Sequence, residues 1–310
     1  MGKLVRDNKA KPERDFVKHR LAGFKGEILR FPHASKSPGL TVIIPTRDAY
    51  GKGYFPILLE QLQRQTAWQN TELVVIKGDN RQGRAINAGA ALARGEYILT
   101  MDDDEVLGSD CVLERLLIAM KENPDVGMAG GMNVIPRDAP PFVKRVMREI
   151  PRRSTPPVDV ITDSDMAEHG LLMMRKKVFK EVGGENELMP RGLDPYLREQ
   201  FRRAGYRIVV VPGAVYSHMP PATLSKLVKQ FYHNGRQAAF VNRNYPQWVI
   251  ETPAAHGRFK ARMPLPLRLL RFPVRLLAAL MTAKPIWFLC SAAYALGFAQ
   301  EFLFIRESQQ

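Results

Sequence analysis

The sequence predicts an α/β protein with a doubly wound sheet, followed by a helical C-terminal region. Three observations point to this class: short apolar runs rich in β-branched residues, helical segments between those runs, and an apolar stretch with interspersed arginines after residue 263. Such apolar runs are typical of buried parallel strands, and their alternation with helices predicts a parallel sheet covered by helices on both faces.

The expected elements follow one another from residue 40. Strands are expected at 40–46, 72–78, 96–105 and 126–135, with helices at 56–66, 84–95 and 111–125. The first strand, LTVIIPT, is apolar and contains a proline near its end, and the Ala-rich helix RAINAGAALARG stops at Gly95. Residues 1–38 are polar and basic without a sustained period, so they are expected to form a solvated tail or a peripheral contact arm.

The net charge of +15 over 310 residues is confined to two flanks. Residues 1–38 hold 10 basic and 4 acidic side chains, and residues 223–310 hold 12 basic and 3 acidic ones. The centre, 39–222, holds 24 of each and is neutral. This distribution argues against a nucleic-acid-binding protein and favours a neutral domain held near an acidic partner.

Cysteine usage and the N-terminal segment indicate a cytosolic location. Cys111 and Cys290 lie far apart and form neither a metal-binding spacing nor a disulfide framework, which fits a reducing compartment. The segment MGKLVRDNKAKPERDF is charged throughout and lacks the apolar stretch of a secretory signal. We therefore expect the chain to stay on the cytosolic side.

Polar residues follow the first three expected strands, where ligands bind in sheets of this class. These segments are PTR (45–47), KGDN (77–80) and the acidic run at 102–105. Four adjacent carboxylates at a strand end repel one another unless a cation compensates them, although a short acidic run is also common in helix caps and solvated turns. Hard oxygen ligands suit Mg²⁺ or Mn²⁺ together with phosphate oxygens, so the sequence favours a metal–phosphate site here.

Residues 40–105 resemble the donor half of an inverting family 2 glycosyltransferase with the GT-A fold. The matching pieces are TVIIPTR, NAGAALARGEYIL and the Asp-x-Asp of Asp102 and Asp104. Further along, 169–187 is similar to the acceptor-side segment of that family, with a strand, a helix and a Gly-Gly turn. Residues 191–218 are similar to its catalytic-base helix and the strand that carries a late histidine. The fold implied is GT-A, the nucleotide-diphospho-sugar transferase fold, over residues 39–222.

The resemblance implies a donor site for a nucleoside-diphosphate sugar. The residues it assigns to donor binding are Pro45, Thr46, Arg47, Asp79, Arg84, Asp102, Asp103 and Arg236. Asp79 is the candidate for base recognition, although it comes slightly later than the family's aspartate. Asp103 is also compatible with simple solvation, Arg84 with a charge-capping role on its helix, and Arg236 with a contact to the diphosphate from a C-terminal helix.

The same resemblance implies a metal site and a general base. Asp104 would bind Mg²⁺ or Mn²⁺ directly, and Asp102 would hold the ribose or share the metal shell. His218 would reach back to the metal or the diphosphate. Asp194 would be the catalytic base that takes the acceptor proton during in-line attack. Leu193 stands where the family commonly has Glu, and Asp194 is equally compatible with a helix N-cap before Pro195.

Two further positions bear on the acceptor. His169 lies in the acceptor-side segment, and its role is open. Processive members of the family carry Gln-x-x-Arg-Trp near 230–236, whereas this chain has QFYHNGR there. Transfer of a single sugar is therefore expected.

The C-terminal region predicts membrane association. Arg268, Arg271 and Arg275 are three or four residues apart among Leu and Phe, which is typical of a helix in the membrane interface. The uncharged run 285–299 has 15 residues, fewer than the roughly 18–20 that span a bilayer. In-plane or re-entrant helices on an anionic surface are expected, with packing of these helices on the catalytic domain as the alternative.

The expected function is therefore metal-dependent, inverting transfer of one sugar to a carbohydrate or lipid-linked acceptor. The expected location is the cytoplasmic face of the cell membrane, in cell-envelope polysaccharide or glycolipid synthesis, and no nucleic-acid partner is expected. Two alternatives remain: a non-catalytic GT-A-like nucleotide-binding scaffold, and a nucleotidyltransferase. The latter would carry a Gly-rich basic loop after the first strand, which PTRDAYGKGY (45–54) matches only loosely.

Overall fold

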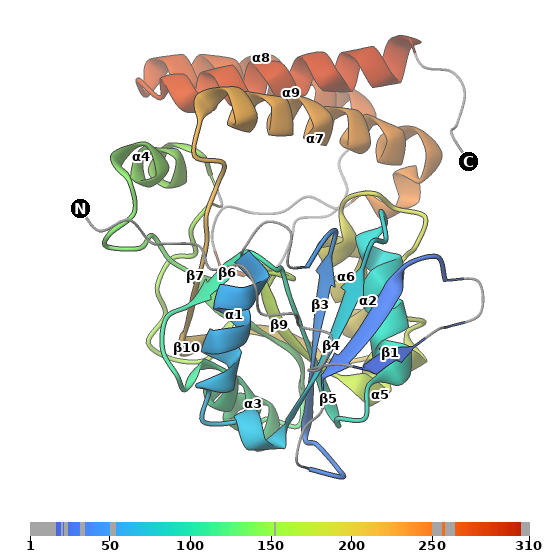
Figure 1. Ribbon diagram of the computed structural model, residues 1–310. Coiled ribbons are helices and arrows are strands. Elements are labelled where there is room, and N and C mark those ends of the chain that lie inside the picture. Colours follow the sequence, from blue (N-terminus) through green and yellow to red (C-terminus); the bar gives the residue numbers. More distant parts are fainter. Residues whose placement is uncertain are drawn as a thin grey trace.

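The protein consists of one large mixed sheet with helices on both faces and three C-terminal helices above it (Figure 1). The computed structural model describes residues 17–19, 21, 24–31, 35–49, 54–151, 153–249, 256–257 and 264–304. Most of the basic N-terminal tail, and the side chain of Arg268, lie outside the described residues.

The sheet order is β1-β2-β4-β3-β5-β9-β7-β10-β6, with β8 paired to β10. The strands are β1 (Val17–His19), β2 (Glu27–Phe31), β3 (Leu40–Thr46), β4 (Thr71–Lys77), β5 (Tyr97–Met101), β6 (Glu105–Leu107), β7 (Val126–Asn133), β8 (Thr162–Asp163), β9 (Leu171–Arg175) and β10 (Arg207–His218). β3 is parallel to β4 and β5, and β7 is parallel to β10.

The expectation of a wholly parallel sheet is wrong, because β9 lies between β5 and β7 and is antiparallel to both. The strand expected at 96–105 ends at Met101, and the chain then turns before entering β6, which pairs antiparallel with β10. The α/β class and the helical C-terminal extension are confirmed. The alternation of strands and helices along the chain does not reveal that β9, which comes late in the sequence, lies between β5 and β7.

The interpretation of residues 1–38 as a solvated tail is also wrong for 27–31. These residues form β2, which pairs antiparallel with β4 and buries Ile28, Leu29 and Phe31. β2 is flanked by charged residues and only five residues long, so its apolar face gives little signal against the basic composition around it. The sheet therefore begins before the neutral segment that starts at residue 39.

Helices cover the two faces of the sheet in the alternating pattern that a doubly wound fold requires. The helices that precede the C-terminal ones are α1 (Tyr54–Gln63), α2 (Gln82–Leu92), α3 (Val112–Glu122), α4 (Pro141–Glu149), α5 (Lys176–Glu181) and α6 (Leu193–Arg203). α1 and α3 share one core with Val42 and Ile44 of β3. α2, α5 and α6 share the other core with Ile43 of the same strand.

The C-terminal helices α7 (Leu224–Asn244), α8 (Leu265–Met281) and α9 (Pro285–Phe304) lie side by side above the sheet (Figure 1). The closest approach is between α7 and α9. A Cβ at Gly235 would lie 2.0 Å from the carbonyl of Tyr294, and one at Gly297 would lie 2.1 Å from that of Tyr232. Only glycine permits this contact between the helices.

α9 is joined to α4 at its first turn. The buried carboxylate of Glu149, the last residue of α4, accepts hydrogen bonds from the backbone N–H groups of Ile286 (2.8 Å) and Trp287 (3.4 Å). An anionic cap at this end satisfies otherwise unpaired N–H groups and complements the helix dipole. α4 therefore fixes where α9 begins.

α9 is longer than the uncharged run from which its length was judged. The helix continues through Gln300 and Glu301 to Phe304, which gives 20 residues, enough in length and composition to cross a membrane. The expectation that this segment is too short to span a membrane is therefore wrong. Within the apolar window of α9, 28% of the residues are buried in the protein, and the others are partly or fully exposed.

Candidate functional site

The candidate site lies at the edge of the sheet where β3, β4, β5 and β10 end. Because β3 is parallel to both β4 and β5, the segments after Thr46, Lys77 and Met101 emerge at one edge. β10 ends at His218, which is paired in register with Glu105 of β6. The acidic run after β5 and the late histidine, 113 residues apart in sequence, are therefore brought together.

Three carboxylates surround the imidazole of His218. Its Nδ1 lies 2.7 Å from Oε1 of Glu105, 3.8 Å from Oδ2 of Asp102 and 4.0 Å from Oδ1 of Asp104. Asp102, Glu105 and His218 each offer one ligand atom, and these atoms all lie within 4.8 Å of one another. Within the described part of the chain, this is the group of acidic, Cys and His side chains that is compact enough to hold an ion.

Burial and mutual repulsion shift the ionisation of this cluster. Burial raises the pKa of Glu105 to about 8, although the hydrogen bond with His218 opposes the shift. Burial alone would lower the pKa of His218, but Glu105, Asp102 and Asp104 outweigh it and raise that pKa to about 9. Burial also raises the pKa of Asp102 above its ordinary value. The cluster therefore favours bound protons, or a cation in their place.

The donor set fits a hard divalent ion. It provides several carboxylate oxygens and one imidazole nitrogen, and Oε2 of Glu105 is buried without a hydrogen-bond partner. Mg²⁺ and Mn²⁺ prefer such oxygen-rich sites and also accept phosphate oxygens. The side chains of Asp102 and Asp104 are partly exposed, which leaves the cluster open on one side.

Asp194 is fixed beside this cluster by the turn that precedes β9. Its Oδ1 accepts a 2.7 Å hydrogen bond from the backbone N–H of His169. Its negative charge contributes to raising the pKa of Asp102, so the two carboxylates influence each other electrostatically. A partly exposed carboxylate next to a metal-type cluster is suited to general-base chemistry.

The helix-cap alternative for Asp194 is wrong. Gly192 is the N-cap residue of α6, in the left-handed conformation at φ 82°, and Leu193 begins the helix. Asp194 is thus in the first turn of α6, and Pro195 follows it inside the helix and not at its first position. Its carboxylate is directed to the turn at His169, which is remote in sequence.

The buried pair of His169 and Glu185 lies next to Asp194. Nε2 of His169 lies 2.7 Å from Oε1 of Glu185 and 3.9 Å from Oδ1 of Asp194, and its Nδ1 lies 3.0 Å from Oγ1 of Thr100. Burial alone would lower the pKa of His169, but the charges of Asp194 and Glu185 outweigh it and raise the pKa to about 9. His169 is therefore cationic at neutral pH.

The loop after β3 contacts the acidic run. Oγ1 of Thr46 donates a 2.5 Å hydrogen bond to Asp103 and accepts one from the backbone N–H of Ala49. The loop after β3 therefore holds Asp103, which is not simply solvated. Pro45 is half-buried and Arg47 is exposed at the same strand end.

Asp79 and Arg84 are bound to one another. Nε and Nη2 of Arg84 donate to the two carboxylate oxygens of Asp79 at 2.7 and 2.8 Å. Burial would raise the pKa of Asp79, but Arg84 and the backbone N–H of Arg81 outweigh it and lower the pKa below its ordinary value. A base or phosphate that used either side chain would have to compete with this ion pair.

Arg236 was predicted to bind the donor, but its described contact is with a C-terminal helix. Its guanidinium lies on α7 and forms an ion pair with Glu301 of α9, at 2.9 Å. Its described contacts therefore join two C-terminal helices.

Three residues of the site were not predicted as site residues. Glu105 belongs to the recognised acidic run, but only its pairing with β10 shows that it is buried against His218. His169 follows Glu168, and Glu185 lies two residues before Glu187, so neither stands out in the sequence as an isolated charge. Only the folded chain shows that the two side chains pair at 2.7 Å.

Residues 77–183 match the family model described as "Glycosyl transferase family 2". No curated protein matches the chain.

Among solved structures, the chain is similar to the mannosyltransferase PcManGT from Pyrobaculum calidifontis in complex with GDP-Man and Mn²⁺. That similarity has a TM-score of 0.53 and 17% identity, over 89% of this chain and 90% of that one. S. aureus TarS 1–349 in complex with UDP is also similar, with a TM-score of 0.43 and 12% identity, over 84% and 90% of the two chains. The family match and the fold together support a glycosyltransferase, and the resemblance to family 2 enzymes with the GT-A fold is confirmed.

Proposed function

We propose that the protein transfers a single sugar from a nucleoside-diphosphate sugar to an acceptor hydroxyl, with inversion and with a divalent metal. The observation that carries this proposal is the juxtaposition of two groups at one edge of the sheet. One is the cluster of Asp102, Glu105 and His218, and the other is the carboxylate of Asp194. Inverting transfer needs charge neutralisation on one side of the sugar and a base on the other.

Asp102, Glu105 and His218 would hold Mg²⁺ or Mn²⁺, with Asp104 at their open side. Bound there, the ion supplies positive charge to the diphosphate as it leaves. The neighbour PcManGT contains GDP-Man and Mn²⁺, which supports the choice of ligand class. The loop of Pro45, Thr46 and Arg47, fixed to Asp103, would line the donor pocket.

Asp194 would take the proton of the acceptor hydroxyl as its oxygen attacks the anomeric carbon opposite the diphosphate. The His169 N–H fixes the direction of one carboxylate oxygen before the acceptor binds. The cationic imidazole of His169 favours the ionised carboxylate, which is the form that accepts a proton.

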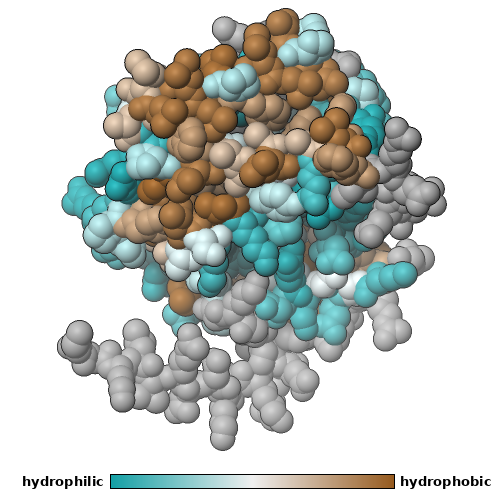
Figure 2. Space-filling view, turned by 90° about the horizontal axis from the view of Figure 1, so that it is seen from above, coloured by the Kyte–Doolittle hydropathy of each residue, from teal (hydrophilic) through white to brown (hydrophobic). Residues whose placement is uncertain are grey.

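The proposed location is the cytoplasmic surface of the cell membrane, where a lipid-linked acceptor would be accessible. The outer surface of α8 and α9 exposes large apolar side chains: Leu267, Leu269, Leu270, Val274, Leu277, Leu280, Met281, Leu289, Leu296, Leu303 and Phe304. Figure 2 displays the extent of this apolar surface over the C-terminal helices. Its area and the arginines of α8 favour an anionic lipid surface as the partner.

Thermal denaturation in the presence of candidate donors tests the proposal. GDP-mannose or UDP-N-acetylglucosamine, each with and without Mn²⁺, would be added to the full chain in detergent. A ligand specific to the folded state raises the melting temperature, and we expect at least one nucleotide sugar to do so only with Mn²⁺. A panel of nucleotide sugars that neither stabilises the protein nor undergoes metal-dependent hydrolysis would contradict it.

A further inference from the structure

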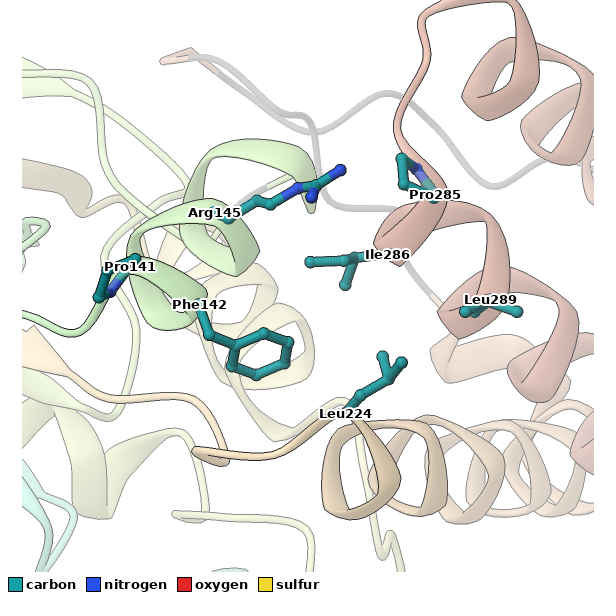
Figure 3. Close-up of a pocket in the computed structure, with 7 residues that line it drawn as sticks. All are labelled: Pro141, Phe142, Arg145, Leu224, Pro285, Ile286 and Leu289. Carbon is teal, nitrogen blue, oxygen red and sulfur yellow. The ribbon is translucent and has the colours of Figure 1, made fainter.

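A cavity lies outside the carboxylate site, between α4, the start of α7 and the start of α9 (Figure 3). Its volume is about 460 Å³, and its lining consists of Pro141, Phe142, Arg145, Leu224, Pro285, Ile286 and Leu289. Figure 3 shows Phe142, Leu224 and Ile286 directed toward one another from the three helices. The size is that of a ligand pocket, not of a packing defect.

The chemistry of the lining selects an apolar ligand with one anionic end. Six of the seven lining residues are apolar and offer no side-chain group to hydrogen-bond a sugar or a base. The exception is Arg145, which extends from α4 toward Pro285 at one side of the cavity (Figure 3). Arg145 is more than half exposed and pairs with Glu149 at 2.5 Å, so its guanidinium is held in position at the rim.

The cavity walls are held in a fixed arrangement. Glu149 binds Arg145 through Oε1 and the backbone N–H groups at the start of α9 through Oε2. The same carboxylate therefore fixes the position of the cationic rim and of the Pro285–Leu289 wall. A preformed site of this kind reduces the entropic cost of binding.

Short chain segments link the cavity to the carboxylate site and to the apolar surface of α9. Leu224 follows His218 by six residues, which limits their separation to about 22 Å. The intervening Met219 packs on Val143 and Met147 of α4. On the other side, Leu289 is 43% exposed and belongs to the apolar surface of α9. The cavity thus lies between the catalytic edge and the proposed membrane-facing surface.

We propose that this cavity binds the hydrocarbon chain of the acceptor, a saccharide joined through phosphate to a single lipid chain. The chain would occupy the space among Phe142, Leu224 and Ile286, the phosphate would face Arg145, and the saccharide would extend toward Asp194. This inference rests on the proposed function and specifies its acceptor class.

Photo-crosslinking tests the inference without requiring turnover. The probe is a single-chain isoprenyl phosphate with a diazirine at the chain end, added in mixed micelles to the full protein. Labelled peptides, identified by mass spectrometry, are expected to come from α4 and from the first turns of α7 and α9. Excess unlabelled isoprenyl phosphate should reduce the labelling severalfold, whereas inorganic phosphate or phosphatidylglycerol should not.

Two variants, each with a matched control, test the inference further. Leu289→Trp fills the cavity and should reduce labelling at least fivefold, whereas Leu296→Trp adds the same ring two turns along the exposed side of α9 and should not. Arg145→Gln should weaken capture of the phosphate probe but not of the corresponding alcohol. Arg148→Gln, on the exposed side of α4 and outside the lining, should leave both unchanged.

Labelling that is equal in Leu289→Trp and Leu296→Trp, or that phosphatidylglycerol abolishes equally well, would overturn the inference. The Mn²⁺-dependent stabilisation by nucleotide sugars is measured on the same variants. If donors stabilise Leu289→Trp normally but no site-specific capture occurs in the unsubstituted chain, the acceptor cavity alone is refuted. If capture is specific but no donor binds, the proposed transfer reaction is refuted instead.

Discussion

The backbone N–H of His169 donates a 2.7 Å hydrogen bond to Oδ1 of Asp194 and thereby joins the turn before β9 to the first turn of α6. The imidazole of the same residue faces the buried carboxylate of Glu185 at 2.7 Å. One residue thus orients the proposed base through its backbone and places a positive charge near it through its side chain. This hydrogen bond connects the segment that begins at His169 with α6, the helix that carries the proposed base.

The His169–Glu185 pair predicts a pH-dependent contribution to stability. The pKa of His169 in the folded protein is about 9, above its ordinary 6.5. The stabilisation is therefore complete below pH 6.5 and is lost as the pH rises through about 9. The double substitution His169→Gln with Glu185→Gln removes both charges and avoids leaving one unpaired. Relative to it, the unsubstituted protein should lose on the order of 2–3 kcal/mol between pH 6.5 and 9.

Urea denaturation of both proteins across this range measures that loss. His233→Gln, at an exposed position on α7, is the control and should follow the unsubstituted protein at every pH. A stability difference between the double variant and the parent that stays constant with pH would show that His169 is not held as a cation by Glu185 and Asp194.

Binding of Mn²⁺ should release protons at pH 7. The pKa values of Glu105 and His218 are about 8 and 9, so both groups carry protons at neutral pH in the metal-free protein. Metal ligation requires the ionised carboxylate and the neutral imidazole. Because the two groups share a hydrogen bond they titrate as a pair, and we expect between about one and two protons released.

Titration calorimetry in buffers of different ionisation enthalpy gives this number. The release should fall toward zero at pH 10, and Glu105→Gln should reduce it together with the affinity. Mn²⁺ binding whose heat is independent of the buffer at pH 7 would place the ion on other ligands.

Arg236 and Glu301 are expected to act as one unit that joins α7 to α9. Arg236→Gln and Glu301→Gln should each lower stability by about 1 kcal/mol, and the double variant should cost no more than either alone. Neither should change the stabilisation produced by nucleotide sugars with Mn²⁺. Weaker donor binding in Arg236→Gln but not in Glu301→Gln would support the diphosphate contact that the family resemblance implies.

Membrane binding should depend on the arginines of α8. Arg271→Gln with Arg275→Gln should weaken binding to vesicles containing phosphatidylglycerol by about 2 kcal/mol, or roughly thirtyfold, and binding should weaken with added salt. Arg64→Gln with Arg203→Gln, two exposed positions on the catalytic region, provides the matched control. Vesicle sedimentation that is insensitive to salt and to both pairs would contradict an electrostatic membrane contact.

The sequence predicted the elements whose signal is local. The strands at β3, β4 and β7 and the helices between them were found because apolar period and strand length are encoded within each segment. The position of β9 between β5 and β7 was not, because strand order depends on contacts between residues that are 42 to 78 positions apart in the sequence. β2 was missed because a short edge-side strand within a charged segment has almost no periodicity of its own.

The residues of the site also divide into those with a local sequence signal and those without one. Asp102 and Asp104 could be recognised from their place after a buried strand, and His218 from its place at the end of β10. The role of Glu105 required the register of β6 against β10, and the His169–Glu185 pair required the folded loop between β9 and α6. Sequence patterns identified residue types suited to metal and base chemistry, but mutual distances decided which of them form pairs.

Asp194→Asn tests most directly whether Asp194 is the base of a metal-dependent sugar transfer. The substitution keeps the size of the side chain and an oxygen for the His169 N–H but removes the proton acceptor. The measurement pairs acceptor-dependent turnover with donor binding, with Glu199→Gln on the same helix as control. We predict a loss of turnover of about 10²–10⁴-fold with donor affinity and Mn²⁺ dependence retained. Near-normal turnover by Asp194→Asn with donor bound would contradict the account.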